Sequence, residues 1–411
     1  MITHAVNFNF VVATLDPRIT FTRSDATATR VNASGYIESV AADTARFDFN
    51  PVTLANRGLL IEEQRTNLLT RSEEFDNAAW AKVNTTISAN AMTAPDGTLT
   101  ADKLVETAVT GTKQFYRPGN VSVTNGIEYT VSIFLKAAER NLVLIQLASQ
   151  AFGPGNLLNL NIATQTVYMG NGTNIRNINI IPYPNGWLRF SVTSTAIATV
   201  SSALTDIRLS ATLGDNGGYT GDGTSGIYLW GAQLEVGAFP TSYIPTTTAA
   251  VTRNADVATI TGTNFSDWWQ ASKGGVLVRA RPGTVSGTRP WLQFDDGTAN
   301  EIIALRGNTT NPELYIVDGG TPQAQIDAGT IAANTDYSLT GWWQTNDCKA
   351  RLDSGAVVTD TTATIPTVTQ ARLGSDGTNY LNGHLASISY YDTFSGQIYT
   401  RRKNKAVFNL M

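Results

Sequence analysis

The chain has 411 residues, enough for two or three domains with substantial cores. Hydrophobic residues make up 42%, as in an ordinary globular protein, but charged residues make up only 15%, so the polar surface must be built from Thr, Ser, Asn and Gln. The net charge of -4 argues against a nucleic-acid partner, because binding phosphates requires clustered Lys and Arg.

Covalent and membrane features are sparse. Cys348 is the single cysteine, which excludes a disulfide within the chain and a cysteine-based zinc site. The segment Met1–Leu15 lacks a basic start and a cleavage motif, so we expect no signal peptide. No apolar run reaches about 20 residues, so we expect no insertion into a membrane.

Residues 1–64 have few helix signals and consist of extended segments. Ile19–Val40 alternates apolar and polar positions in places, and the segments Ala45–Thr53 and Arg57–Leu69 follow it. This block is too short and too polar to form a large core of its own. We therefore expect an N-terminal extended arm that serves attachment or oligomerisation.

Residues 65–246 contain short β runs at regular spacing, separated by turn residues, which is typical of a sandwich or jelly roll. A short helix is expected at Ser72–Ala81, where Ser72 is a candidate cap. The stretch from Pro240 to Pro245 follows the last strand and begins a linker. The expected strands are Tyr129–Ala137, Leu142–Ala148, Leu157–Asn161, Trp187–Thr195, Ile207–Leu213 and Ile227–Val236.

Residues 247–411 repeat the all-β pattern and are expected to form a second sandwich. Trp342 and Trp343 are adjacent, so in a strand they point to opposite faces and at most one belongs to the inner core. The fold class expected from the whole sequence is therefore all-β, with two β-sandwich domains in tandem after the arm. The expected strands are Gly275–Arg281, Trp291–Asp295, Glu301–Arg306, Glu313–Val317, Tyr337–Gln344, Lys349–Leu352, Ala371–Gly374 and Gly383–Tyr391.

Three segments resemble a module that recurs in tailed-phage and prophage virion proteins, the tail fibres and head spikes: Gly58–Lys82, Ala94–Leu104 and Gly226–Thr246. The resemblance covers roughly residues 10–250. It implies a galactose-binding-like, carbohydrate-binding jelly roll for residues 65–246. The segment Ala371–Asp392 resembles a concanavalin-like or laminin-G-like sandwich, and the resemblance ends after Asp392.

Catalytic patterns are weak in this sequence. Glycoside hydrolysis needs two carboxyl groups on opposite sides of the scissile bond, whereas Glu62–Glu63, Glu73–Glu74 and Asp295–Asp296 are neighbours in sequence and on a strand would face opposite ways. His384 has no nucleophile motif beside it, and a packed or surface histidine is the expected role. We therefore expect a non-enzyme.

Glycan binding commonly uses aromatic rings next to polar side chains. Each candidate ring has core or interface packing as its alternative, and Trp80, Trp187 and Trp230 are assigned to packing. The oxygen-rich loop with Asp215, Asn216 and Asp222 is a candidate calcium site, with an ordinary turn-rich loop as the alternative. The glycan-binding candidates are Tyr219, Trp268, Trp269, Trp342, Trp343 and Tyr380.

The function expected from the sequence is that of a phage virion fibre or spike, on tail or head, that engages host surface glycans without catalysis. The resemblance implies a homotrimer on the surface of the phage particle, in contact with other virion proteins. Such a protein would be made in the host cytoplasm without a signal peptide. The alternatives are a purely structural capsid decoration or tail component, and a polysaccharide-cleaving tailspike.

Overall fold

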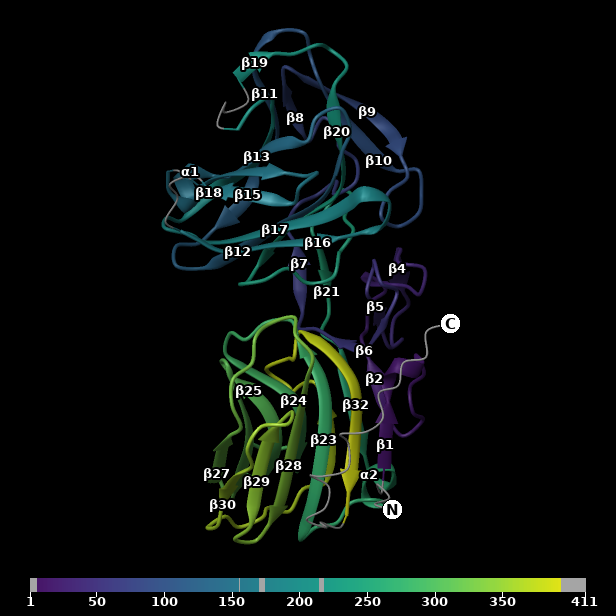
Figure 1. The fold of residues 1–411 in the computed structure, drawn as a ribbon, viewed down its shortest axis with the longest axis vertical. Helices are drawn as coiled ribbons and strands as arrows, with labels where there is room; N and C mark the ends of the chain where they lie inside the picture. The colour runs from purple at the N-terminus through teal and green to yellow at the C-terminus, as the bar shows by residue number, and fades with distance from the viewer. Residues whose placement is uncertain (1–5, 155, 170–173, 214–217, 393–411) are drawn as a thin grey trace.

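The computed structural model describes residues 6–154, 156–169, 174–213 and 218–392 and confirms the predicted all-β class. Strands make up 53% of the described residues and helices 4%. Two sandwiches follow one another along the long axis of the molecule (Figure 1). None of the helices in these residues is long and apolar enough to cross a bilayer.

The first sandwich has two antiparallel sheets around a core that includes Phe75, Leu104 and Phe115. One sheet contains, in order, β16 (Ile175–Pro182), β17 (Trp187–Thr195), β12 (Glu128–Ala137), β20 (Gly226–Val236), β10 (Ala101–Glu106) and β9 (Thr85–Met92). The other contains β15 (Thr166–Met169), β14 (Leu157–Asn161), β13 (Leu142–Leu147), β18 (Val200–Ser210), β11 (Thr110–Val123) and β19 (Gly218–Thr220), with β8 (Ala81–Val83) also paired to β11.

Strand β12 is buried on both faces, although Thr130 and Ser132 alternate with its apolar residues. Val131 and Ile133 face the core between the sheets, whereas Phe134 points outward into a smaller cluster with Trp230 and Tyr243. Ile37, from the N-terminal region, joins this smaller cluster. The outer face of the sheet is thus covered by segments that come before and after the sandwich in sequence.

The second sandwich also has two antiparallel sheets, with a core that contains Trp291, Phe294 and Trp343. One sheet contains β30 (Val358–Asp360), β29 (Cys348–Leu352), β28 (Tyr337–Gln344), β23 (Lys273–Pro282), β32 (Gly383–Tyr391), β6 (Asn56–Ile61) and β5 (Phe47–Phe49), and β1 (Val6–Asn9) also pairs with β32. The other contains β2 (Thr20–Thr22), β22 (Val257–Thr261), β31 (Gln370–Leu373), β24 (Thr288–Asp295), β25 (Ile302–Asn308), β26 (Asn311–Asp318) and β27 (Thr321–Asp327).

The N-terminal segment, predicted as an arm over residues 1–64, supplies strands to both sheets of the second sandwich. Strand β6 pairs with β32 so that Leu59 lies opposite Leu385. Gly58 has φ +99°, and a Cβ atom there would lie 2.1 Å from the carbonyl oxygen of Leu385, so a glycine is needed at this close approach. The role of this segment in attachment or oligomerisation stays a prediction.

Two short antiparallel strands connect the sandwiches. The chain enters the first sandwich through β7 (Arg65–Asn67) and leaves it through β21 (Val251–Arg253), and these two strands pair with each other. They lie between the two sandwiches (Figure 1). Near them, the N-terminal hairpin of β3 (Ala28–Val31) and β4 (Ile37–Val40) packs beside the first sandwich.

The helix predicted at Ser72–Ala81 is wrong, because this segment forms turns. Instead of capping a helix, the Ser72 hydroxyl bonds to Tyr243 Oη at 2.7 Å and accepts from the amide of Thr246 at 2.8 Å. The amide of Phe75 donates to Asp102 Oδ2 at 3.0 Å. These contacts with distant segments hold the chain out of a helix. The helices within the described ranges are α1 (Ser149–Phe152), α2 (Thr263–Ser266) and the 3-10 turns η1 (Phe10–Val12) and η2 (Pro184–Gly186).

Candidate functional site

A pocket of about 150 Å³ lies where the N-terminal segment meets both sandwiches. We call it the junction pocket. The N-terminal segment, the first sandwich and loops of the second sandwich all contribute to its lining. Pockets at domain junctions are common ligand sites. Its polar lining includes Asp48, Arg57, Asn179, Tyr183, Asn334 and His384.

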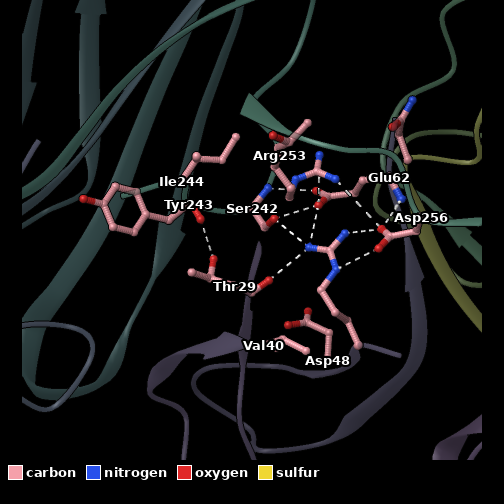
Figure 2. A network of polar contacts seen from close by, with 12 residues as sticks. Thr29, Val40, Asp48, Glu62, Ser242, Tyr243, Ile244, Arg253 and Asp256 are labelled. Carbon is pink, nitrogen blue, oxygen red and sulfur yellow. Dashed lines mark hydrogen bonds and ion pairs between the residues drawn. The ribbon is translucent and has the colours of Figure 1, made fainter. Parts of the chain in front are cut away.

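Figure 2 shows a buried ion network, which borders this pocket through Glu62. The Glu62 carboxylate, which lines the pocket, accepts from Arg46 Nη1 at 2.9 Å and from the amide and hydroxyl of Ser242 at 2.8 and 2.7 Å. Behind Glu62, Asp256 accepts from Arg23 Nη1 at 3.1 Å and from Arg46. Arg253 Nη2 lies 3.5 Å from Glu62. The network therefore ties the N-terminal segment to the chain that leaves the first sandwich.

Charge pairing keeps this network ionised despite its burial. Burial alone would raise the pKa of Glu62, but the positive charges of Arg253 and Arg46 and the bonds from Ser242 hold it well below the ordinary value of 4.5. Burial opposes the charge of Arg46 as well, yet Asp256 and Glu62 raise its pKa above the usual range. Glu62 is thus a permanent anion and has no proton to donate at neutral pH.

A second polar group in the pocket is built around Asp48, which lies on β5. Its Oδ1 accepts from the amide of Val31 at 2.7 Å, and its Oδ2 lies 2.8 Å from His384 Nε2. Arg57 Nη1 lies 4.0 Å from the same Oδ2. Burial lowers the pKa of Arg57, an effect that the Asp48 charge partly offsets. The guanidinium of Arg57 is therefore only weakly paired.

Strand β16 presents a third group, because alternate residues of a strand face the same side. Asn179 and Ile181 on β16, and Tyr183 just beyond its end, all line the pocket. The Tyr183 ring packs edge-on against Phe134 at 5.1 Å, and burial raises the pKa of its hydroxyl to about 12. In the described part of the chain, neither the Tyr183 hydroxyl nor the side-chain amide of Asn179 has a hydrogen-bond partner. Both are available to a ligand.

The aromatic candidates from the sequence lie elsewhere. Trp342 and Trp343 are 3% and 1% exposed, and only Trp343 belongs to the core cluster, as expected for adjacent strand residues. Rings this deeply buried present no face to a sugar, so the structure does not support a glycan contact at either residue. Trp268 and Trp269 are half-buried and pack against the same core, with Trp269 stacked on Trp343 at 5.7 Å.

Of the remaining two candidates, Tyr219 lies in the first sandwich and Tyr380 packs against the core of the second. Tyr219 lies on β19 of the first sandwich, where its hydroxyl donates to Glu106 and its ring lies 5.2 Å from the Arg140 guanidinium. Tyr380 is half-buried in the loop before β32. The structure thus gathers Trp268, Trp269 and Trp343 in one place but does not bring all six residues together. Trp80, Trp187 and Trp230 are buried, which confirms their assignment to packing.

The calcium prediction falls partly outside the described residues, where Asp215 and Asn216 lie. The Asp222 carboxylate is occupied locally, since its Oδ1 accepts from the amides of Thr224 and Ser225 at 2.8 and 2.7 Å. Across the ranges that the structure describes, no three His, Cys, Asp or Glu side chains are grouped to hold a metal. Calcium at this loop stays a prediction.

Sequence patterns alone missed the polar lining of the junction pocket. The alternation of Asn179, Ile181 and Tyr183 is visible in the sequence and indicates one strand face. The sequence gives no sign that this face meets Asp48 and His384, which are 336 positions apart. That meeting depends on the pairing of β6 with β32.

Comparisons with known proteins place this chain in no family: no family model matches it, and no curated protein does. Among solved structures it is similar to domains LG4-5 of the mouse laminin alpha1 chain, with 10% identity over 69% of this chain and 86% of that one, at a TM-score of 0.23. It is also similar to the LG1-3 region of the laminin alpha2 chain, with 10% identity over 68% of this chain and 64% of that one, at a TM-score of 0.24. A third similar structure is a bifunctional GH43-CE protein of Bacteroides eggerthii, with 10% identity over 93% of this chain and 62% of that one, at a TM-score of 0.19. TM-scores this low do not establish a fold, so the sandwich fold is assigned from the sheets of this chain alone.

Proposed function

We propose that this chain is a bacteriophage virion protein, a fibre or spike on tail or head, that engages host surface glycans without catalysis. The observation that carries the glycan part is the junction pocket, which combines unused hydrogen-bonding groups with aromatic rings. The virion part is supported by the resemblance of Gly58–Lys82, Ala94–Leu104 and Gly226–Thr246 to phage fibre proteins.

The size and chemistry of the junction pocket suit one sugar ring. A cavity of about 150 Å³ holds a six-membered ring such as benzene. Tyr183 and Phe239 supply apolar ring surface, while Asn179 and Asn334 supply amide donors and acceptors for hydroxyl groups. A hydroxyl-rich ring would satisfy these polar groups, which an apolar ligand would leave unpaired.

The carboxylates in the pocket support a non-catalytic role. A glycosidase needs a protonated carboxylic acid to donate to the leaving oxygen. Glu62 cannot serve, because Arg46, Arg253 and Ser242 hold it as an anion. Asp48 already accepts from Val31 and contacts His384. Neither carboxylate is placed as a free general acid.

In this proposal the protein acts on the surface of the phage particle, as a homotrimer bound to other virion proteins. It would be synthesised in the host cytoplasm without a signal peptide. In solution, light scattering after size-exclusion chromatography measures the mass of the assembly. Three copies of the 44.1 kDa chain are expected, and a monomer at micromolar concentration would contradict the trimer.

The test of function is retention of the purified protein on bacterial cells and on their extracted surface polysaccharides, together with an assay for released reducing ends. We expect saturable retention without release. The double variant N179A/Y183F should lose retention, whereas Y219F, at a separate part of the first sandwich, should keep it. Release of reducing ends would refute the non-catalytic role. Absence of retention on every polysaccharide would favour a purely structural virion component.

A further inference from the structure

The charges around the junction pocket include two guanidinium groups without a close carboxylate. Arg189 is 7% exposed, and its hydrogen bonds go to the carbonyl of Thr241 at 2.8 Å and the hydroxyl of Ser132 at 2.9 Å. Among the described residues it forms no ion pair. Within the same residues, the one ion contact of Arg57 is with Asp48 at 4.0 Å. Both guanidinium groups line the pocket.

The other charged groups that line the pocket are already paired. Arg30 donates from Nε to Glu38 at 2.7 Å, and Glu62 is held by Arg46 and Ser242. Asp48 opposes an anion here, and both of its oxygens already have partners in Val31 and His384. Asp336 adds a negative charge near Arg57, but it is paired with Arg281 at 3.3 Å. The charges that act on the Tyr183 hydroxyl are those of Arg189, Asp48 and Arg57, two positive and one negative.

We propose that the junction pocket selects a sugar that carries a carboxylate, with Arg57 as its partner and the Tyr183 hydroxyl as a neighbouring donor. This inference rests on the proposed glycan binding at the same pocket. The planar fork of an arginine matches a carboxylate through two parallel hydrogen bonds. Burial removes water from the half-buried guanidinium of Arg57, and Asp48 lies 4.0 Å away from it. A ligand carboxylate would supply a closer countercharge.

A carboxylate fits this site better than a phosphate monoester does. The surplus near Tyr183 is a single positive charge, counted as Arg57 and Arg189 against Asp48. A carboxylate brings one negative charge, whereas a phosphate monoester brings close to two at neutral pH. The second negative charge would lie near Asp48 in a partly buried site, where repulsion is weakly screened.

The test compares glucose, glucuronate and glucose 6-phosphate as ligands of the full chain at pH 7, with dissociation constants from NMR titration. Glucuronate should bind at least ten-fold more tightly than either other sugar, and raising the salt concentration should weaken glucuronate binding alone. R57Q should reduce glucuronate binding about ten-fold, to the level of glucose, and leave glucose binding unchanged. R18Q, which alters an arginine paired with Asp16 outside the pocket, is the matched control.

A second arm separates this inference from the proposed function. A retained acidic polysaccharide is tested before and after chemical reduction of its carboxylates to alcohols. Loss of retention on reduction supports the inference. The carboxylate inference would be overturned, while glycan binding stands, by equal retention of both forms or by equal binding of glucose and glucuronate. Tighter binding of glucose 6-phosphate, or unchanged glucuronate binding by R57Q, would overturn it as well. Retention of neither form, with no sugar bound, would overturn both. Circular dichroism verifies that R57Q is folded.

Discussion

Arg46 and Asp256 are 210 positions apart and form a two-point ion pair between fully buried side chains. Arg46 Nε donates to Asp256 Oδ1 at 3.3 Å, and Nη2 donates to Oδ2. Asp256 Oδ2 also accepts from the amide of Glu62 at 2.9 Å. Arg23 also donates to Asp256, so the same carboxylate fixes the N-terminal segment at three places beside β22. The junction pocket depends on this contact, because Asp48, Arg57 and Glu62 all come from that segment.

Replacing Asp256 by Asn should destabilise the second sandwich strongly. The variant leaves Arg23 and Arg46 buried without full countercharge, and removing one partner of a buried pair costs about 3–5 kcal/mol. We expect a loss of that size in the free energy of unfolding, measured by guanidinium denaturation followed by tryptophan fluorescence. The control is R18Q in the partly exposed Arg18–Asp16 pair, for which a loss below about 1 kcal/mol is expected. Similar losses in both variants would contradict the proposed importance of the network.

Acid should weaken the same junction through Glu62. Its pKa in the folded chain lies below the ordinary 4.5, so the folded state holds fewer protons than the unfolded state in this range. The stabilisation from Glu62 is therefore complete above about pH 4.5 and is lost as the pH falls through the folded value. The measurement is the unfolding free energy between pH 7 and pH 3.

The variant E62Q separates this contribution from those of other carboxylates. It should be less stable than the wild type at pH 7 and should lose less stability on acidification. E38Q, which alters a more exposed partner of Arg30, should follow the wild-type acid profile. An acid profile of E62Q parallel to that of the wild type would show that Glu62 does not titrate with folding.

The strands could be predicted from local patterns, whereas the pairing of distant segments could not. The run Ile227–Val236 lies within β20, and the opposite orientations of Trp342 and Trp343 follow from the two-residue period of a strand. By contrast, β6 and β32 pair Leu60 with His384, and no local periodicity encodes that partnership. The N-terminal segment therefore had the appearance of an arm in sequence, although its strands complete the second sandwich.

The candidate site was missed for the same reason. Residue type favours Trp and Tyr as glycan-binding side chains, yet Trp343 is needed to fill the core next to Phe294. The open hydrogen-bonding groups belong to Asn179 and Tyr183, whose neighbours come from distant parts of the chain. Residue type indicates which side chains suit a sugar, but burial decides which of them reach one.

Cys348 should be unreactive in the folded chain. Its side chain is fully buried on β29, and its Sγ lies 3.6 Å from the carbonyl oxygen of Gln344. Burial raises the pKa of the thiol from the ordinary 9.0 to about 11, and the thiolate is the reactive form. We expect no modification by iodoacetamide at pH 8 without denaturant and complete modification in guanidinium, both measured by mass spectrometry. Rapid labelling of the folded protein would contradict the burial of this residue.

The same thiol should contribute to alkaline destabilisation. Because its pKa is higher in the folded chain, the folded state binds more protons than the unfolded state, so the stabilisation is complete below about pH 9 and is lost as the pH rises to about 11. A difference of two pKa units corresponds to at most about 2.7 kcal/mol.

Tyrosines titrate over a similar range, so the informative quantity is the difference between the wild type and C348A. C348A should lose less stability between pH 8 and pH 11, since it retains every tyrosine and lacks only the thiol. Equal losses would mean that the thiol ionises as readily in the folded chain as in the unfolded one.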